Sequence, residues 1–145
     1  MAYMSQERKK EIANSVKTLL NEKYKKYNVK CSFSVNHHST LVCKIKSASF
    51  DLLSEFIDSF EPPTVNDKWL EMVKRDRIYD VNVYQLNRGS SDIGTESVAR
   101  NIVKDIHNCM MVGNFDESDS MTDYFHVGWY TDLTIGSFGS PFQVV

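Results

Sequence analysis

A histidine and a threonine two residues apart are the first pair in this chain whose types and spacing suggest chemistry. His38 and Thr40 form a His-x-Thr triplet, the local signature of phosphodiesterases in which two such triplets act as acid and base on a phosphate. A two-histidine mechanism needs a second copy to divide the two roles. The other candidate is His126, where Gly128 two residues later supplies no hydroxyl. One complete triplet is present, and a phosphodiesterase-like hydrolase is kept as an alternative with no catalytic residue assigned.

Metal binding is the second chemistry that clustered side chains suggest. Two thiols and two imidazoles lie close together in the chain, at Cys31, His37, His38 and Cys43. Both cysteines alternate with polar residues at positions that favour small apolar side chains, so we predict reduced, buried thiols and no metal. The acidic run 116–123 lacks the turn glycine and the terminal glutamate of a calcium loop. No phosphate-binding or dinucleotide motif occurs, and we expect no cofactor.

Charge is unevenly distributed along the chain, although the formal net charge is only -2. Residues 1–46 carry a net charge of +7, residues 47–104 a net charge of -3, and residues 105–145, which contain no Lys or Arg, a net charge of -6. This asymmetry predicts a basic and an acidic surface, each able to steer a partner of opposite charge. Attraction between the two ends within the fold, or simple solvation of lysine-rich helix faces, explains the same pattern without a partner.

Nucleic-acid binding is an alternative that the basic segment supports. A lysine-rich helix packed beside a basic hairpin could lie along a phosphate backbone. The near-neutral total charge, the scarcity of arginine and the acidic last third of the chain count against it. The residues that would make this contact are Lys9, Lys10, Lys17, Lys23, Lys44 and Lys46.

The elements that must position these residues begin with a helix and a hairpin. Ser5 is a suitable cap for a first helix, whose apolar residues recur at helical spacing on one face. Residues 30–46 alternate polar and apolar side chains on either side of a connection at 36–40, which predicts a β-hairpin. A short amphipathic helix follows over 50–60 and is ended by two prolines.

The second part of the chain predicts two more strands and a long helix. A weak segment around 69–73 leads to a strand over 78–86, Thr95 opens the helix, and the clearest period-two alternation covers 124–135. The fold class that follows is α+β, in one domain over residues 1–145. We expect a mainly antiparallel sheet of about four strands with helices packed on one face, in the order α-β-β-α-β-α-β.

The segments that would direct the protein to a membrane or out of the cell are absent from the sequence. Charged residues stand near the start where a secretory signal would need an apolar run, and no stretch approaches about 20 apolar residues. We therefore expect a cytoplasmic protein that does not contact a membrane.

Three stretches of the sequence resemble a family of small proteins and domains from bacteriophages and plasmids, the large polyvalent protein associated type. They are AYMSQERKKEIANSVKTLL, NHHSTLVCKIKS and SDSMTDYFHVGWYTDLTIGSFGSPFQV, about half of the chain. The family commonly has Asp where this chain has His126, which argues against a required histidine there. The resemblance implies a mobile-element origin and an accessory role in a bacterial cytoplasm, and it carries over no catalytic residue.

The sequence thus predicts a small accessory protein that binds a host macromolecule, a host protein before a nucleic acid, in counter-defence or host takeover. The oligomeric state stays open. Aromatic and charged residues interleaved on an exposed strand are good contact material. The predicted partner-binding residues, from the hairpin connection and the last strand, are His37, His38, Thr40, Asp123, Tyr124, His126, Tyr130 and Asp132.

Overall fold

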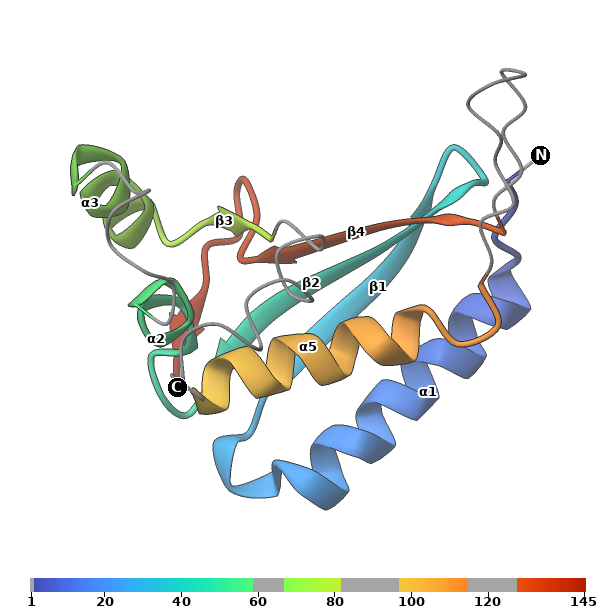
Figure 1. Cartoon of the computed structure of the whole chain (residues 1–145), viewed down its shortest axis with the longest axis horizontal. Helices are drawn as coiled ribbons and strands as arrows, with labels where there is room; N and C mark the ends of the chain where they lie inside the picture. Colours follow the sequence, from blue (N-terminus) through green and yellow to red (C-terminus); the bar gives the residue numbers. More distant parts are fainter. Residues whose placement is uncertain (1, 59–66, 82–96, 115–127) are drawn as a thin grey trace, which may run out of the picture.

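Two long helices lie on the same side of a five-stranded sheet in the computed structural model of the chain (Figure 1). The structure describes residues 2–58, 67–81, 97–114 and 128–145. The helices are α1 (Gln6–Lys23), η1 (Lys25–Tyr27, a 3-10 turn), α2 (Leu52–Asp58), α3 (Asp67–Asp76) and α5 (Val98–Met110). The strands are β1 (Lys30–Asn36), β2 (Thr40–Ala48), β3 (Tyr79–Asp80), β4 (Tyr130–Ile135) and β5 (Gln143–Val144).

The sheet is mixed, in the order β1-β2-β4-β3. β1 and β2 form the predicted antiparallel hairpin, and β3 pairs antiparallel with β4. β4 and β5 both run parallel to β2, β4 beside its first part and β5 beside its end. The expected α+β class is confirmed, whereas the two parallel pairings differ from the mainly antiparallel expectation. Parallel neighbours need a long crossover between them, and the chain between β2 and β4 contains α2, α3 and α5.

The first helix has the predicted cap and the predicted buried face. The Ser5 hydroxyl accepts a hydrogen bond from the backbone N–H of Arg8 at 3.0 Å, which satisfies one of the free donors at the helix start. Ile12, Val16 and Leu20 are buried in the core. Polar residues on the other faces of α1 stay in solvent, so the helix is amphipathic and packs on the sheet by one stripe.

Strand alternation divides the sheet into an inner face that packs against the helices and an outer face. Apolar side chains of the inner face on β2 and β4 are buried with residues of α5 and α2 in one core, and those of β1 pack against it partly buried. The fully buried members on β2 and β4 are Leu41, Cys43, Ile45, Leu133 and Ile135. Burial of this kind is the main stabilising contribution to the fold, at roughly 1.5–3 kcal/mol for each large apolar side chain.

The remaining elements refine the sequence-based expectations. Residues around 69–73 lie in helix α3, and the described part of the 78–86 strand is only Tyr79–Asp80. The described part of the later helix begins at Val98 and is capped by Ser97, whose hydroxyl accepts from the N–H of Arg100 at 3.0 Å, while Thr95 lies outside the described residues. None of the helices in the described ranges is both long enough and apolar enough to cross a membrane.

Candidate functional site

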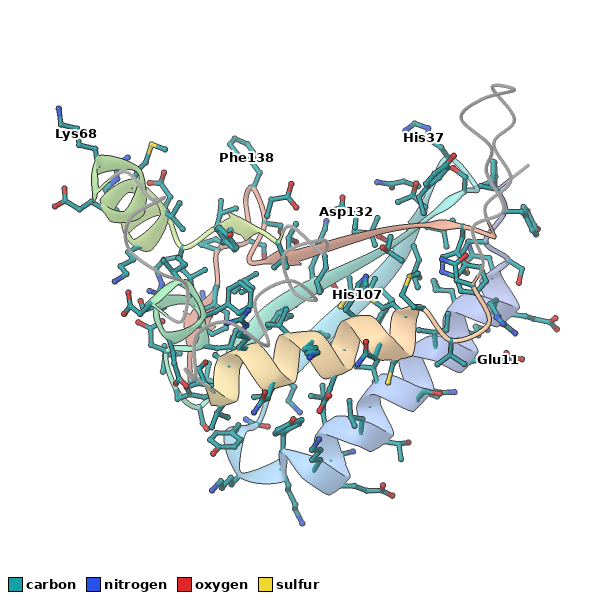
Figure 2. All side chains as sticks on the ribbon, viewed as in Figure 1. Glu11, His37, Lys68, His107, Asp132 and Phe138 are labelled. Atoms are coloured by element: carbon teal, nitrogen blue, oxygen red, sulfur yellow. The ribbon has the colours of Figure 1, made fainter. Side chains whose placement is uncertain are left out.

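The turn between β1 and β2 places two histidines in a backbone conformation that residues other than glycine rarely adopt. The Ser39 N–H donates to the Asn36 carbonyl at 3.2 Å, and the residues between them, His37 and His38, have φ values of 54° and 58°. Positive φ at both central residues is the signature of a type I′ turn, which normally favours Asn and Gly. Both histidines are exposed, and Figure 2 shows His37 at the tip of the hairpin.

Three segments far apart in the sequence meet at this turn. The N–H of Met4 donates to the carbonyl of His38 at 2.7 Å, and the N–H of Tyr130 donates to the carbonyl of Ser39 at 2.8 Å. The N–H of Tyr3 donates to the carbonyl of Gly128 at 2.9 Å. The hairpin tip, the segment before α1 and the start of β4 are therefore joined by backbone hydrogen bonds.

The five described residues predicted to bind a partner lie close together at this turn and along the start of β4. Thr40 is directly opposite Tyr130 in the parallel β2–β4 ladder, and His37 and His38 precede Thr40 in the turn. Asp132 follows two residues after Tyr130 and so points to the same outer face. The Tyr130 side chain is 51% exposed. These five residues, His37, His38, Thr40, Tyr130 and Asp132, are called the Tyr130 surface below. Asp123, Tyr124 and His126 lie outside the described residues.

A pair of carboxyl groups extends this outer face toward β3. Asp80 on β3 lies opposite Thr134 on β4, diagonal to Asp132. Burial raises the pKa of Asp80, and the negative charge of Asp132 and a hydrogen bond between the two carboxyl groups raise it further. The buried Thr134 hydroxyl nearby has no hydrogen-bond partner within the described part of the chain. Asp80 thus holds its proton more firmly than an ordinary aspartate, and the sequence did not identify it because only β3–β4 pairing brings it to Asp132.

The thiols and imidazoles that suggested a metal site point to different places. Cys43 is buried in the core and Cys31 is half-buried, both on the inner face, whereas the two histidines stand exposed at the turn. A hydrogen bond with the thiol of Cys31, together with burial, raises the pKa of Cys43 well above its ordinary value, so this thiol stays protonated and unreactive. The cysteines are free, as predicted, and no cluster of metal-ligating side chains occurs in the described ranges.

The lysines predicted to form one nucleic-acid-binding surface are divided between two sides of the sheet. Lys44 alternates with the buried Cys43 and Ile45 on β2, so Lys44 and Lys46 belong to the outer face. The helix α1, which carries Lys9, Lys10, Lys17 and Lys23, packs its buried stripe into the core on the inner side. Lys23 also donates to Asp105 at 2.9 Å. Lys44 and Lys46 therefore lie on the face of the sheet opposite to the one on which α1 packs.

No second His-x-Thr triplet lies beside His38 and Thr40 in the part of the chain that the structure describes. His38 is exposed at the turn and Thr40 begins β2, while the triplet around His126 lies outside the described residues. A different histidine, His107 on α5, is buried, its Nε2 has no hydrogen-bond partner in the ranges described, and burial lowers its pKa. Figure 2 shows it on the helix layer, whereas Asp132 lies on β4 in the sheet. The neutral ring therefore belongs to the core, next to Ile106 on the buried side of the helix.

One further exposed side chain was not predicted. Phe138, in the connection between β4 and β5, is 99% exposed and points away from the body of the protein in Figure 2. Ser137 and Ser140 close this turn with reciprocal backbone hydrogen bonds of 3.0 and 2.8 Å. The Gly and Ser content of residues 136–140 signals a turn, but no sequence pattern tells which side chain stands at its tip.

Comparisons of the chain with protein-family models, curated proteins and solved structures found no significant match.

Proposed function

We propose that this chain is a non-enzymatic accessory protein that binds a host protein through the Tyr130 surface. The observation that carries the proposal is the position of Tyr130, whose half-exposed ring stands on a strand hydrogen-bonded to the strained His37–His38 turn. Backbone strain in an ordered turn persists only where the surroundings hold it, and such strain is concentrated at functional sites.

The chemistry of the Tyr130 surface fits a protein partner. A tyrosine supplies a large apolar area with a polar end, and it is one of the residue types that dominate binding energy at protein interfaces. Tyr130 and Asp132 belong to β4, and Thr40 to β2, so binding requires little ordering of the backbone. The Asp132 carboxylate, two residues from the tyrosine on the same face, favours a partner with basic or neutral groups over a phosphate backbone there.

The accessory role rests on the resemblance to the large polyvalent protein associated family of bacteriophages and plasmids. The resemblance implies a bacterial cytoplasm as the place of action and counter-defence or host takeover as the task. No part of this proposal requires a cofactor.

The test is capture of partners from host lysate by the tagged protein and by the double variant Tyr130→Ala/Asp132→Ala. The captured host protein should disappear with the variant while its thermal unfolding curve stays nearly unchanged. Met72→Ala on α3, which removes a comparably exposed side chain elsewhere, should capture the partner normally. Retention of the partner by the double variant, or unfolding of that variant, would remove Tyr130 and Asp132 from the binding site.

A further inference from the structure

β1 is an edge strand, and the register shows which of its backbone groups lie on the open side. Within the described ranges it pairs only with β2. The carbonyls of Ser39 and Ile45 accept hydrogen bonds from β4 and its extension at Tyr130 and Gly136, so odd-numbered residues of β2 direct their backbone groups to β4. Even-numbered residues of β2 therefore face β1, where Val42 is opposite Ser34.

It follows that the backbone N–H and C=O groups of Cys31, Phe33 and Val35 point away from β2, toward the open edge. The side chains of the same three residues lie on the inner face and are only partly buried against the core. The edge thus combines a row of backbone donors and acceptors with apolar side chains that a further strand would cover. β1 is seven residues long and contains no proline, so no residue of the strand lacks a backbone N–H.

Lysines border this edge. α1 packs against β1 and also against α5. Arg8 and Lys23 mark the flank of α1 that faces α5, because Arg8 donates to the carbonyl of Val112 at 3.3 Å and Lys23 binds Asp105. At about 100° of rotation per residue, Lys10 and Lys17 stand nearly half a turn of helix from that flank, on the side away from α5.

The acidic residues of α1 stand on other parts of the helix. By the same rotation, Glu11 and Glu22 lie between solvent and the α5 flank, and Glu11 is 3.9 Å from Arg8. Glu7 lies toward solvent, one turn before Lys10. Lys10, Lys17 and Lys30, which begins β1, are all exposed, and they give the open edge a positive border.

We propose that the open edge of β1 binds an extended acidic peptide segment of a partner protein, which adds to the sheet as a strand beside β1. The backbone of the segment would pair with Cys31, Phe33 and Val35, and its carboxylates would contact Lys10, Lys17 and Lys30. Addition of a strand to a sheet edge is an established mode of peptide recognition, in which main-chain hydrogen bonds supply affinity and side-chain contacts supply selectivity. The site is separate from the Tyr130 surface, which lies on the outer face.

The positive charge at the edge favours an acidic peptide over a second copy of the chain as the added strand. Pairing of two β1 edges would bring two sets of Lys10, Lys17 and Lys30 to the same border, where like charges repel. An acidic segment would instead be attracted by these lysines, so charge complementarity favours the peptide.

The experiment measures binding of a fluorescein-labelled synthetic peptide of alternating Glu and Val to the full chain by fluorescence anisotropy at low salt. The charge-reversed variant Lys10→Glu/Lys17→Glu should bind it about tenfold more weakly or worse, because each exposed ion pair contributes up to about 1 kcal/mol and reversal makes it repulsive. The same variant should bind a peptide of alternating Lys and Val better than the unmodified protein does. Added salt should weaken both complexes.

A second pair of variants tests the backbone pairing. Val35→Pro removes an N–H that points to the open edge, a place where a strand tolerates proline, and it should lose peptide binding. Val35→Thr keeps the N–H and should bind as the unmodified protein does. An acidic peptide that is N-methylated at alternate residues should fail to bind, and Tyr130→Ala/Asp132→Ala should bind the peptide normally.

Several results would overturn the inference. They are absence of peptide binding by the unmodified protein, equal binding of the N-methylated and unmethylated peptides, and unchanged affinity in Lys10→Glu/Lys17→Glu. A concentration-dependent dimer in sedimentation that Val35→Pro abolishes would also overturn it, and would assign the edge to a second copy of the chain. Binding of an oligothymidylate strand with no binding of the acidic peptide would assign the lysines to nucleic acid.

Discussion

At the scale of residues, the hairpin turn places two histidines in the left-handed backbone region, where Asn and Gly are favoured. A residue with a Cβ atom in the left-handed region costs about 1–2 kcal/mol relative to one in the usual region. His37 and His38 both occupy that region, with φ values of 54° and 58°, where Asn and Gly would be less strained. Neither imidazole is buried, so core packing does not explain why histidines stand there.

The double variant His37→Asn/His38→Gly should therefore stabilise the protein by about 1–2 kcal/mol, measured as the free energy of unfolding in urea. His37→Ala/His38→Ala is the matched control, since it removes both rings and keeps both Cβ atoms, and it should bring no stabilisation. If the Asn-Gly variant is more stable and no longer captures the partner, the histidines are retained for contact. A less stable Asn-Gly variant would show that the turn is not strained.

At the scale of elements, one carboxylate joins the two long helices. Asp105 on α5 accepts hydrogen bonds from the Tyr24 hydroxyl at 2.6 Å and from the Lys23 ammonium at 2.9 Å, both at the end of α1. Burial by itself raises the pKa of Asp105, but the hydrogen bonds and positive charge of these partners outweigh it, and the net pKa is lowered. Tyr24 is buried beside the core, which makes its hydroxyl the partner that most needs this bond.

Asp105→Asn should reduce the free energy of unfolding at neutral pH by about 1 kcal/mol. A carboxyl whose pKa is lower in the folded than in the unfolded state stabilises above its unfolded pKa of about 4 and loses that contribution as the pH falls through its folded pKa. The difference between the unmodified protein and the variant should therefore shrink in urea titrations below about pH 4.

Asp58→Asn is the control for this prediction, because its ion pair with Lys74 at 2.8 Å is more exposed, and it should change stability less. A difference between Asp105→Asn and the unmodified protein that is the same at every pH would contradict the role given to the ionised carboxylate.

At the scale of the whole molecule, elements far apart in the sequence meet at the bend where β4 ends. The Gly136 N–H donates to the Ile45 carbonyl on β2, and the Phe142 N–H donates to the carbonyl of Arg77, which precedes β3. The Arg77 guanidinium lies over the Phe142 ring, 5.5 Å from its centroid, and donates to both carboxylate oxygens of Asp51 before α2. This junction joins α2, α3, β2 and the β4–β5 connection.

Gly136→Ala should lower the free energy of unfolding by about 2–4 kcal/mol, measured in urea. Its φ of 74° is unfavourable for alanine, and the added Cβ would clash with the carbonyl oxygen of Arg77 and lie 2.7 Å from the N atom of Phe142. Gly139→Ala is matched in φ, at 83°, and meets open space, so it should lose only about 1 kcal/mol. Equal losses in the two variants would show that the crowding at Gly136 does not matter.

The fold was predictable to the extent that local patterns determine it. Helical spacing identified α1, α2 and the buried face of α5, and period-two alternation identified the β1–β2 hairpin and the inner and outer residues of β4. Strand direction was not predictable, because the parallel pairing of β2 with β4 depends on how the chain between them, which includes α2, α3 and α5, returns to the sheet. Helix α3 was missed as a helix because its apolar residues are confined to the short run 69–73, between charged residues at both ends.

The candidate site was predictable in part for the same reason. Alternation placed Tyr130 and Asp132 on the exposed side of the last strand, and Thr40 was predicted in the hairpin connection. The structure begins β2 at Thr40, and the β2–β4 register makes these residues neighbours. The carboxyl pair of Asp80 and Asp132 and the exposed Phe138 depend on contacts between β3, β4 and β5 that no local pattern encodes.

The sequence by itself determined the α+β class, the amphipathic faces, the free thiols and the charge gradient, because each follows from residue type and spacing along a few turns or strand residues. Only the tertiary structure decided how the positive charge is divided. It places Lys44 and Lys46 on the outer face of the sheet and Lys10 and Lys17 on the helix layer beside the open edge of β1, because α1 packs across the inner face of the hairpin. Proximity between residues distant in the chain is set by strand pairing and helix packing, and these arise only when the whole core forms.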